Sequence, residues 1–168
     1  MRIYLLLILS IVISGCANTE YRETNKAELK GSLDVRWIEN DYFLFLPNSD
    51  DPFTLVREDG TSINPGPMYT DGGSIPRFLW GVKGFSPWGY APAYIIHDWV
   101  FVAHHCDYEP DKKYSFNDSV TLLKESLKAV MEKNDEYRNY FVFNSMSAGA
   151  NSNIAKSLWE KGVCKTPP

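Results

Sequence analysis

The segment AYIIHDWVFVAHH, residues 93–105, is the most informative part of this chain about its fold. Apolar residues occupy most faces of a helix built from it, which predicts a helix buried in the core rather than one lying on the surface. Two polar residues, His97 and Asp98, nevertheless stand in its middle. Burying a carboxylate or an imidazole without hydrogen-bond partners is unfavourable, so the rest of the fold must supply partners for both side chains.

The segments before this helix predict strands. Runs of strand length at residues 33–39, 42–47, 53–58 and 61–70 are rich in aromatic and β-branched residues, and turn residues separate them. Short runs of this composition between turn residues are typical of antiparallel strands joined in sequence. The first part of the domain is therefore predicted to be a small antiparallel β-meander.

The segments after the central helix continue with helical periodicity. Ser115 is placed to cap a second helix, whose core-facing stripe includes Val120, Leu123 and Leu127. A third helix is predicted to begin near Asp135, and the stretch IAKSLWEKG finishes the domain. The predicted fold class is α+β, with a small N-terminal antiparallel β-meander followed by a packed helical portion of three or four helices.

The first 15 residues, MRIYLLLILSIVISG, are typical of a lipoprotein signal peptide. Their apolar run is shorter than the ~20 residues that a membrane-spanning helix needs. The ending Ile-Ser-Gly-Cys resembles the bacterial lipobox, which implies that Cys16 is acylated and anchors the protein in the cell envelope, at the outer membrane if the host is Gram-negative. An ordinary signal peptide or an uncleaved anchor is the alternative. Residues 16–31 predict a lipidated, polar tether, and residues 32–168 predict a single globular domain.

The charge balance excludes one class of partner. The chain has 17 Lys and Arg residues against 21 Asp and Glu residues, for a formal net charge of −4, and its basic residues do not cluster. Because nucleic-acid binding needs a basic surface, we expect no nucleic-acid partner.

Two cysteines remain after the lipobox, at Cys106 and Cys164. In an exported chain these two thiols predict one disulfide. The alternative is a metal site made by His104, His105 and Cys106, although adjacent residues on a helix point in different directions. The negative pole of a helix also favours histidines in its last turn, which accounts for both histidines without a metal.

Four polar groups are candidates for one site. Asp71 lies in the Gly-containing stretch TDGGSIPR, residues 70–77, and Asp118 lies at the start of the second helix. A neutral histidine held by a carboxylate suits general-base work on water, so His97 and Asp118 are predicted to be catalytic. Oxygen ligands suit hard cations, so Asp71, the Gly72 carbonyl and Asp98 are predicted to bind one divalent cation, with calcium favoured.

Each of these residues also has a purely structural interpretation. Asp118 follows Ser115 by three residues, as an acid favoured by the helix dipole would. Asp71 is suited to an Asx-type turn before two glycines. His97 and Asp98 are able to pair with backbone groups and so specify packing alone.

The order of these motifs resembles two known families. TDGGSIPR, then HDW at residues 97–99, then an Asp at the next helix is similar to a phage and bacterial family, domain-of-unknown-function family 1353, over residues 33–162. The same constellation resembles, at the level of the motif, the active site of bacterial and fungal secreted phospholipase A2. That resemblance implies catalysis by His97 and Asp118 with calcium, and the chain departs from both patterns at Phe101, where a tyrosine is usual.

Two functions follow as expectations. The first is an envelope lipoprotein of phage type with a metal-assisted hydrolytic site, acting on a lipid or on another envelope ester or amide in the manner of a phospholipase A2. The second is a non-enzymatic lipoprotein that binds an envelope partner, as in superinfection exclusion. The first requires the four polar groups to meet at one pocket, and the second does not.

Overall fold

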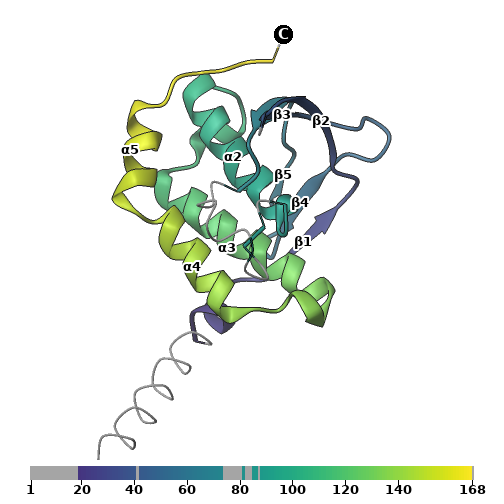
Figure 1. Ribbon diagram of the computed structural model, residues 1–168, viewed down its shortest axis with the longest axis vertical. Coiled ribbons are helices and arrows are strands. Elements are labelled where there is room, and N and C mark those ends of the chain that lie inside the picture. The colour runs from purple at the N-terminus through teal and green to yellow at the C-terminus, as the bar shows by residue number, and fades with distance from the viewer. Residues whose placement is uncertain (1–18, 41, 74–80, 82–84, 87, 168) are drawn as a thin grey trace, which may run out of the picture.

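The computed structural model describes residues 19–167 except 41, 74–80, 82–84 and 87. Its strands come first in the chain and its helices after, so the predicted α+β class is confirmed. In Figure 1 the strands lie on one side and the helices on the other. The strands are β1 Ala27–Lys30, β2 Asp34–Glu39, β3 Tyr42–Leu46, β4 Thr54–Arg57, β5 Ser62–Ile63 and β6 Met68–Thr70. The α-helices are α2 Ala91–Cys106, α3 Phe116–Lys133, α4 Tyr140–Ala150 and α5 Asn153–Lys161, and the 3-10 turns are η2 Asp111–Lys113 and η3 Asp135–Tyr137.

The predicted antiparallel β portion is present as two three-stranded sheets. One has the order β1-β4-β5 and the other has the order β2-β3-β6, and every pairing is antiparallel. The hairpin β2–β3 belongs to the second sheet although it lies between β1 and β4 in the sequence. The second sheet matters most for the site, because its strand β6 ends at Thr70 beside the Gly72-Gly73 turn.

The domain begins earlier than residue 32, so the prediction of a tether reaching residue 31 is wrong for its later part. β1 pairs with β4, and Leu29 in β1 is buried. Tyr21 is also buried, with its ring 5.0 Å from that of Tyr140 and 5.1 Å from that of Phe143. Two isolated apolar residues give no periodic signal in a polar stretch, because their partners come from α4 and β4. The signal peptide and Cys16 lie outside the described residues.

Helix α2 forms the centre of the domain. Ile95, Ile96, Val100 and Ala103 are fully buried between the sheets and α3, as the apolar pattern predicted. A buried ion pair joins the first sheet to α3, where Arg57 donates to both carboxylate oxygens of Glu125 at 2.7 and 2.8 Å. The ion pair holds the first sheet against α3, and α2 packs in the same hydrophobic core as both.

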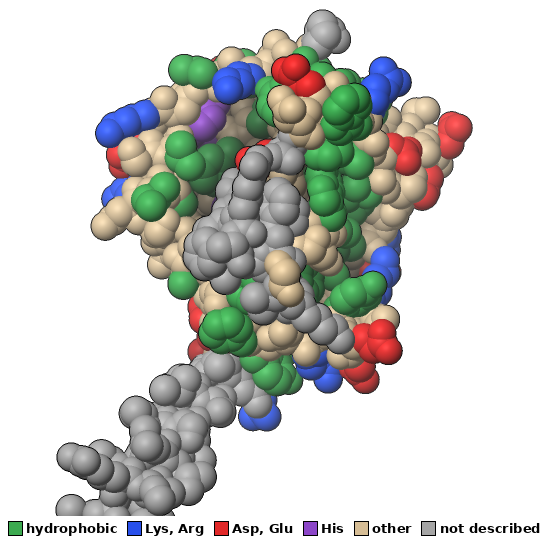
Figure 2. Space-filling view, in the orientation of Figure 1, with side chains coloured by type: hydrophobic (Ala, Val, Ile, Leu, Met, Phe, Trp, Pro, Cys, Tyr) green, Lys and Arg blue, Asp and Glu red, His purple; other side chains and the backbone are tan. Residues whose placement is uncertain are grey.

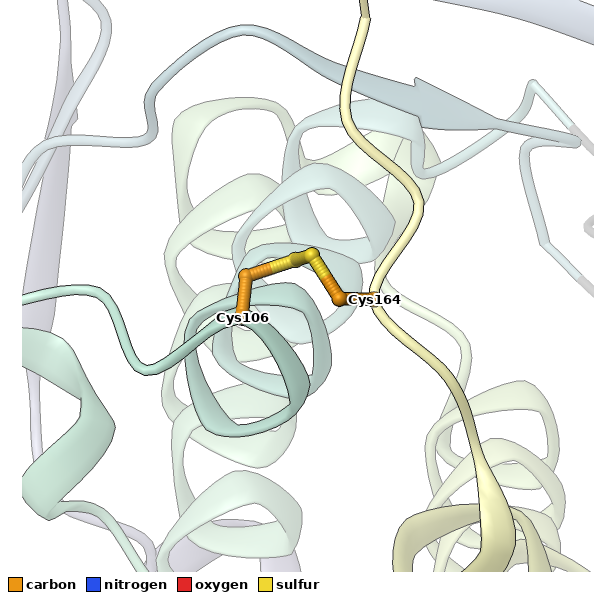
Figure 3. Close-up of a disulfide and its surroundings, with 2 residues drawn as sticks. All are labelled: Cys106 and Cys164. Carbon is orange, nitrogen blue, oxygen red and sulfur yellow. A yellow bond between two sulfur atoms is a disulfide. The ribbon is translucent and has the colours of Figure 1, made fainter.

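The predicted disulfide between Cys106 and Cys164 is confirmed. It joins the last residue of α2 to the segment after α5, with the two Cα atoms 4.7 Å apart (Figure 3). The neighbouring histidines serve packing, because the His104 ring stacks on Trp159 at 4.0 Å and His105 Nε2 lies 2.9 Å from the Trp159 carbonyl oxygen. The alternative metal site at this end of α2 is therefore wrong, since its thiol is part of the disulfide.

Candidate functional site

A cavity of about 720 Å³ runs along one face of α2. The α2 residues that line it recur every three or four positions, which places them on one stripe of the helix. The loop after β6, helices α4 and α5, and the segment after α5 provide other walls among the described residues. In Figure 2 hydrophobic side chains and a histidine gather around a recess in the upper part of the face. The lining residues from α2 are Tyr94, His97, Asp98, Phe101, Val102 and His105.

The ring of His97 is held in one tautomer. Its Nδ1 lies 3.1 Å from the backbone carbonyl oxygen of Ser119 in α3. A carbonyl only accepts hydrogen bonds, so Nδ1 carries the proton and Nε2 keeps its lone pair. Burial lowers the pKa of His97 to about 4, against a smaller opposing effect of the Ser119 carbonyl. The ring is therefore neutral at pH 7, with an acceptor nitrogen in a residue that lines the cavity.

The carboxyl group of Asp98 is held by the end of β6. Thr70 Oγ1 donates to Asp98 Oδ2 over 2.7 Å, and the same hydroxyl oxygen accepts from Gly72 N at 2.9 Å. The pKa of Asp98 is raised to about 8, because the effect of burial, to which the negative charge of Asp71 adds, outweighs the opposing effect of the Thr70 hydrogen bond. Asp98 is partly exposed, because it lines the cavity. With a pKa of about 8, its carboxyl group is mostly protonated at neutral pH.

The two glycines after Asp71 are required by the backbone and by packing. Gly72 has a φ of 78°, in the left-handed region where a side chain is strained. Gly73 faces the ring of Tyr94 so closely that an added Cβ would lie 2.6 Å from Cε2. The Gly-Gly turn thus brings the backbone of the loop against α2 and places Asp71 at the cavity.

Asp118 does not hold His97, so its predicted role as the catalytic partner is wrong. It is exposed and forms a capping box at the start of α3, where its Oδ2 accepts from Ser115 N at 2.8 Å and from Ser115 Oγ at 2.6 Å. Its own backbone N–H donates to Ser115 Oγ at 3.2 Å. The helix-start interpretation of Asp118 is the correct one, because the orphan N–H groups of the first turn are the nearest partners.

Two residues that complete the site were missed by the sequence analysis. Ser119 acts through its backbone carbonyl, which every residue has and which gives no sequence signal. Thr70 acts through its hydroxyl, and its position directly before Asp71 in TDGG is the only hint the sequence offers. The cavity therefore brings together Asp71, Gly72, His97 and Asp98 and leaves Asp118 aside.

The residues fit a hard cation in part. Asp71 is close enough to raise the pKa of Asp98, and a cation between two such carboxylates would relieve this repulsion. Calcium takes six to eight oxygen ligands, so the Gly72 carbonyl and water would have to add to the two carboxylates. Within the described part of the chain, no three His, Cys, Asp or Glu side chains group as metal ligands.

Comparisons with protein-family models, with curated proteins and with solved structures find no match to this chain. In the described residues, no helix is both long and apolar enough to cross a membrane. The case for a function therefore depends on the geometry of the cavity and on the sequence motifs.

Proposed function

We propose that the protein is a lipid-anchored envelope hydrolase of phage type, which cleaves an ester or amide bond of a lipid or of another envelope component in the α2 cavity. One observation carries the proposal: His97, whose Nδ1 is held by the Ser119 carbonyl so that Nε2 stays unprotonated, lines a cavity that Asp71 and Asp98 also line. A neutral histidine beside two carboxyl groups and an apolar wall supplies a base, polar positioning groups and a place for an acyl group.

In the proposed reaction, His97 Nε2 takes a proton from a water molecule as that water attacks the substrate carbonyl. The protonated ring then gives this proton to the leaving alcohol oxygen or amine nitrogen as the ester C–O or amide C–N bond breaks, which returns His97 to its neutral form. The Ser119 carbonyl keeps the ring oriented and stabilises the positive charge that the ring acquires. A carbonyl does this less well than a carboxylate would, and a base of low pKa is a weak base, so we expect slow turnover.

The loop after β6 completes the proposed site. Asp71, Asp98 and the Gly72 carbonyl would hold one calcium ion, which when bound polarises the carbonyl under attack. Thr70 holds Asp98 in place for this role through its hydroxyl group. The resemblance to secreted phospholipase A2 supports the same assignment of Asp71, Gly72, His97 and Asp98, with Ser119 in place of the supporting aspartate.

The proposal is tested with a purified form that begins at Thr19 and with p-nitrophenyl esters of butyric and octanoic acids. His97→Asn is expected to lower kcat by about a hundred-fold or more, since a positioned general base contributes that much. Asp118→Asn is the matched control and should keep its kcat, because Asp118 only caps α3. Equal hydrolysis by the wild type and His97→Asn would refute the assignment.

A second candidate function has one observation in its favour. Strand β2 is an edge strand in which every residue is exposed, and its side chains include the apolar Val35, Trp37 and Ile38. Exposed edge strands accept a strand from another protein. We propose as the alternative that the protein binds an envelope partner through β2, as a superinfection-exclusion lipoprotein.

The two candidates are separated by a phage challenge of cells that express the full chain. Trp37→Lys should abolish protection if β2 binds the partner, whereas His97→Asn should leave protection intact. Protection that depends on His97 and is unaffected by Trp37→Lys would favour the hydrolase instead.

A further inference from the structure

The segment after α5 forms one wall of the cavity. Residues 162–167, here called the tail, have no helix or strand, and Val163 and Lys165 line the cavity. Cys164 lies between these two residues and is bonded to Cys106 at the end of α2 (Figure 3). The disulfide therefore ties the tail to α2 at the point where the tail borders the cavity.

The direction of the tail is also fixed at its first residue. Gly162 N donates to the Leu158 carbonyl oxygen at 2.8 Å, which closes α5. Gly162 packs against the His105 ring so closely that an added Cβ would lie 2.1 Å from Cε1. Glycine at this position thus allows the tail to pass directly over the end of α2 on its way to Cys164.

Helix α5 presents apolar side chains to the same part of the cavity. Ile154 and Leu158 line it together with Val163, yet these three side chains are 76%, 59% and 69% exposed. The buried residue of α5 is Trp159, which stacks on His104 on another side. Three large apolar side chains that border one cavity and remain exposed are suited to an apolar ligand.

The two parts of the cavity differ in polarity. His105 lies eight residues after His97 on α2, which is about 12 Å along the helix at 1.5 Å per residue. Thr70, Asp71 and Asp98 line the part near His97, whereas Leu158 and Val163, next to Gly162, line the part near His105, where Lys165 of the tail also lines the cavity. A cavity of about 720 Å³ lies within the usual range of small-ligand sites, about 300–1,000 Å³. Its volume and its mixture of polar and apolar lining residues fit an amphiphile with one polar group and one apolar chain.

We infer that α5 and the disulfide-held tail form a binding wall for the apolar chain of such an amphiphile, and that Ile154, Leu158 and Val163 determine which chain is accepted. The Cys106–Cys164 disulfide positions this wall. The inference deepens the proposed function, since it names the residues that select its substrate, but binding at this wall needs neither His97 nor a cation.

The experiment measures binding and not hydrolysis, so its failure is distinct from a failure of the proposed reaction. Dansyl-labelled undecanoic acid is titrated into the protein that begins at Thr19, and unlabelled octanoic and hexadecanoic acids compete. We expect saturable binding by the wild type and equal binding by Asp118→Asn, since Asp118 caps α3 and does not line the cavity. Val163→Ser, which keeps the disulfide, should weaken binding about ten-fold, the value of one well-buried apolar side chain.

Three further variants test the wall. Leu158→Trp should reduce the competition by hexadecanoic acid more than that by octanoic acid, because the larger side chain shortens the apolar part of the cavity. The double variant Cys106→Ser, Cys164→Ser should weaken binding at least as much as Val163→Ser, with far-UV circular dichroism reporting whether it folds. Trp37→Ser is the matched control, because Trp37 is 64% exposed but does not line the cavity. The inference is overturned if the wild type does not bind the probe, or if Val163→Ser and Leu158→Trp bind as the wild type does.

Discussion

Thr70 Oγ1 donates a hydrogen bond of 2.7 Å to Asp98 Oδ2, so the last residue of β6 holds a carboxyl group in the middle of α2. The residue directly before Asp98, His97, is held instead by the backbone carbonyl of Ser119 in α3. Successive residues of a helix are about 100° apart around its axis, which is why two neighbours have supports on different elements. Both His97 and Asp98 line the cavity.

Thr70→Val should destabilise the protein. The change removes the donor to Asp98 and the acceptor of Gly72 N, and Thr70 itself is buried. Leaving buried polar groups without partners costs about 1–3 kcal/mol, which urea denaturation would measure. Thr54→Val is the control, because its hydroxyl bonds to Asn64 at the surface, and it should cost less. Equal stability of Thr70→Val and the wild type would contradict the inferred role of this hydroxyl.

Stability should depend on pH through Asp98 when calcium is removed with a chelator. The pKa of Asp98 is raised to about 8 in the folded protein, so the folded state keeps a proton that the unfolded chain releases above its ordinary pKa of about 3.9. Unfolding therefore releases this proton, and the contribution of Asp98 to stability falls as the pH rises from about 4 to about 8. His97, whose pKa burial lowers to about 4, acts in the opposite direction between about pH 4 and 6.5, so the net fall is expected above that range. Asp98→Asn should flatten this part of the profile of melting temperature against pH. A profile that is the same in the variant would show that Asp98 is not the group responsible.

Calcium should stabilise the protein more at pH 8.5 than at pH 6. The proposed ion needs Asp98 as a carboxylate, and below a pKa of about 8 that side chain must first lose its proton. The measurement is the gain in melting temperature on adding calcium at each pH, with magnesium for comparison. Asp71→Asn and Asp98→Asn should both remove the gain. A gain that survives both substitutions would place the ion elsewhere.

Ser115→Ala should lower stability by about 1 kcal/mol, the usual value of an N-cap, because Ser115 and Asp118 together cap α3. Chemical denaturation gives the value, and kcat of the folded variant should match that of the wild type. A loss of kcat without a loss of stability would indicate that Ser115 and Asp118 take part in the reaction.

Cys16→Ser should move the full-length protein out of the membrane fraction. The lipobox resemblance makes this sulfur the site of acylation, and the acyl chains supply the anchor. Fractionation of cells and the mass of the mature N-terminal peptide test it. Unchanged fractionation together with a wild-type peptide that lacks acyl groups would exclude the anchor.

Several features could be predicted from the sequence because their signals are local or periodic. The apolar run around Ile95 and Ile96 identified the buried central helix, and the spacing of Ser115 and Asp118 marked the start of the next one. The pairing of Cys106 with Cys164 followed from there being only two cysteines after Cys16. These predictions were correct because helix periodicity and capping involve residues close together in the sequence, and because two cysteines allow only one pairing.

The completion of the site, in contrast, depends on contacts between segments that are far apart in the sequence. His97 has a backbone carbonyl as its partner where an aspartate was predicted, and any residue could supply that carbonyl. Strand β1 could not be predicted from its polar segment. Its one buried residue, Leu29, pairs with Leu55 in β4, which lies elsewhere in the sequence. The cavity wall of Leu158 and Val163 likewise depends on how α5 and the tail cross α2. Such contacts are made between distant segments, so their geometry is set by packing and has no pattern of its own along the chain.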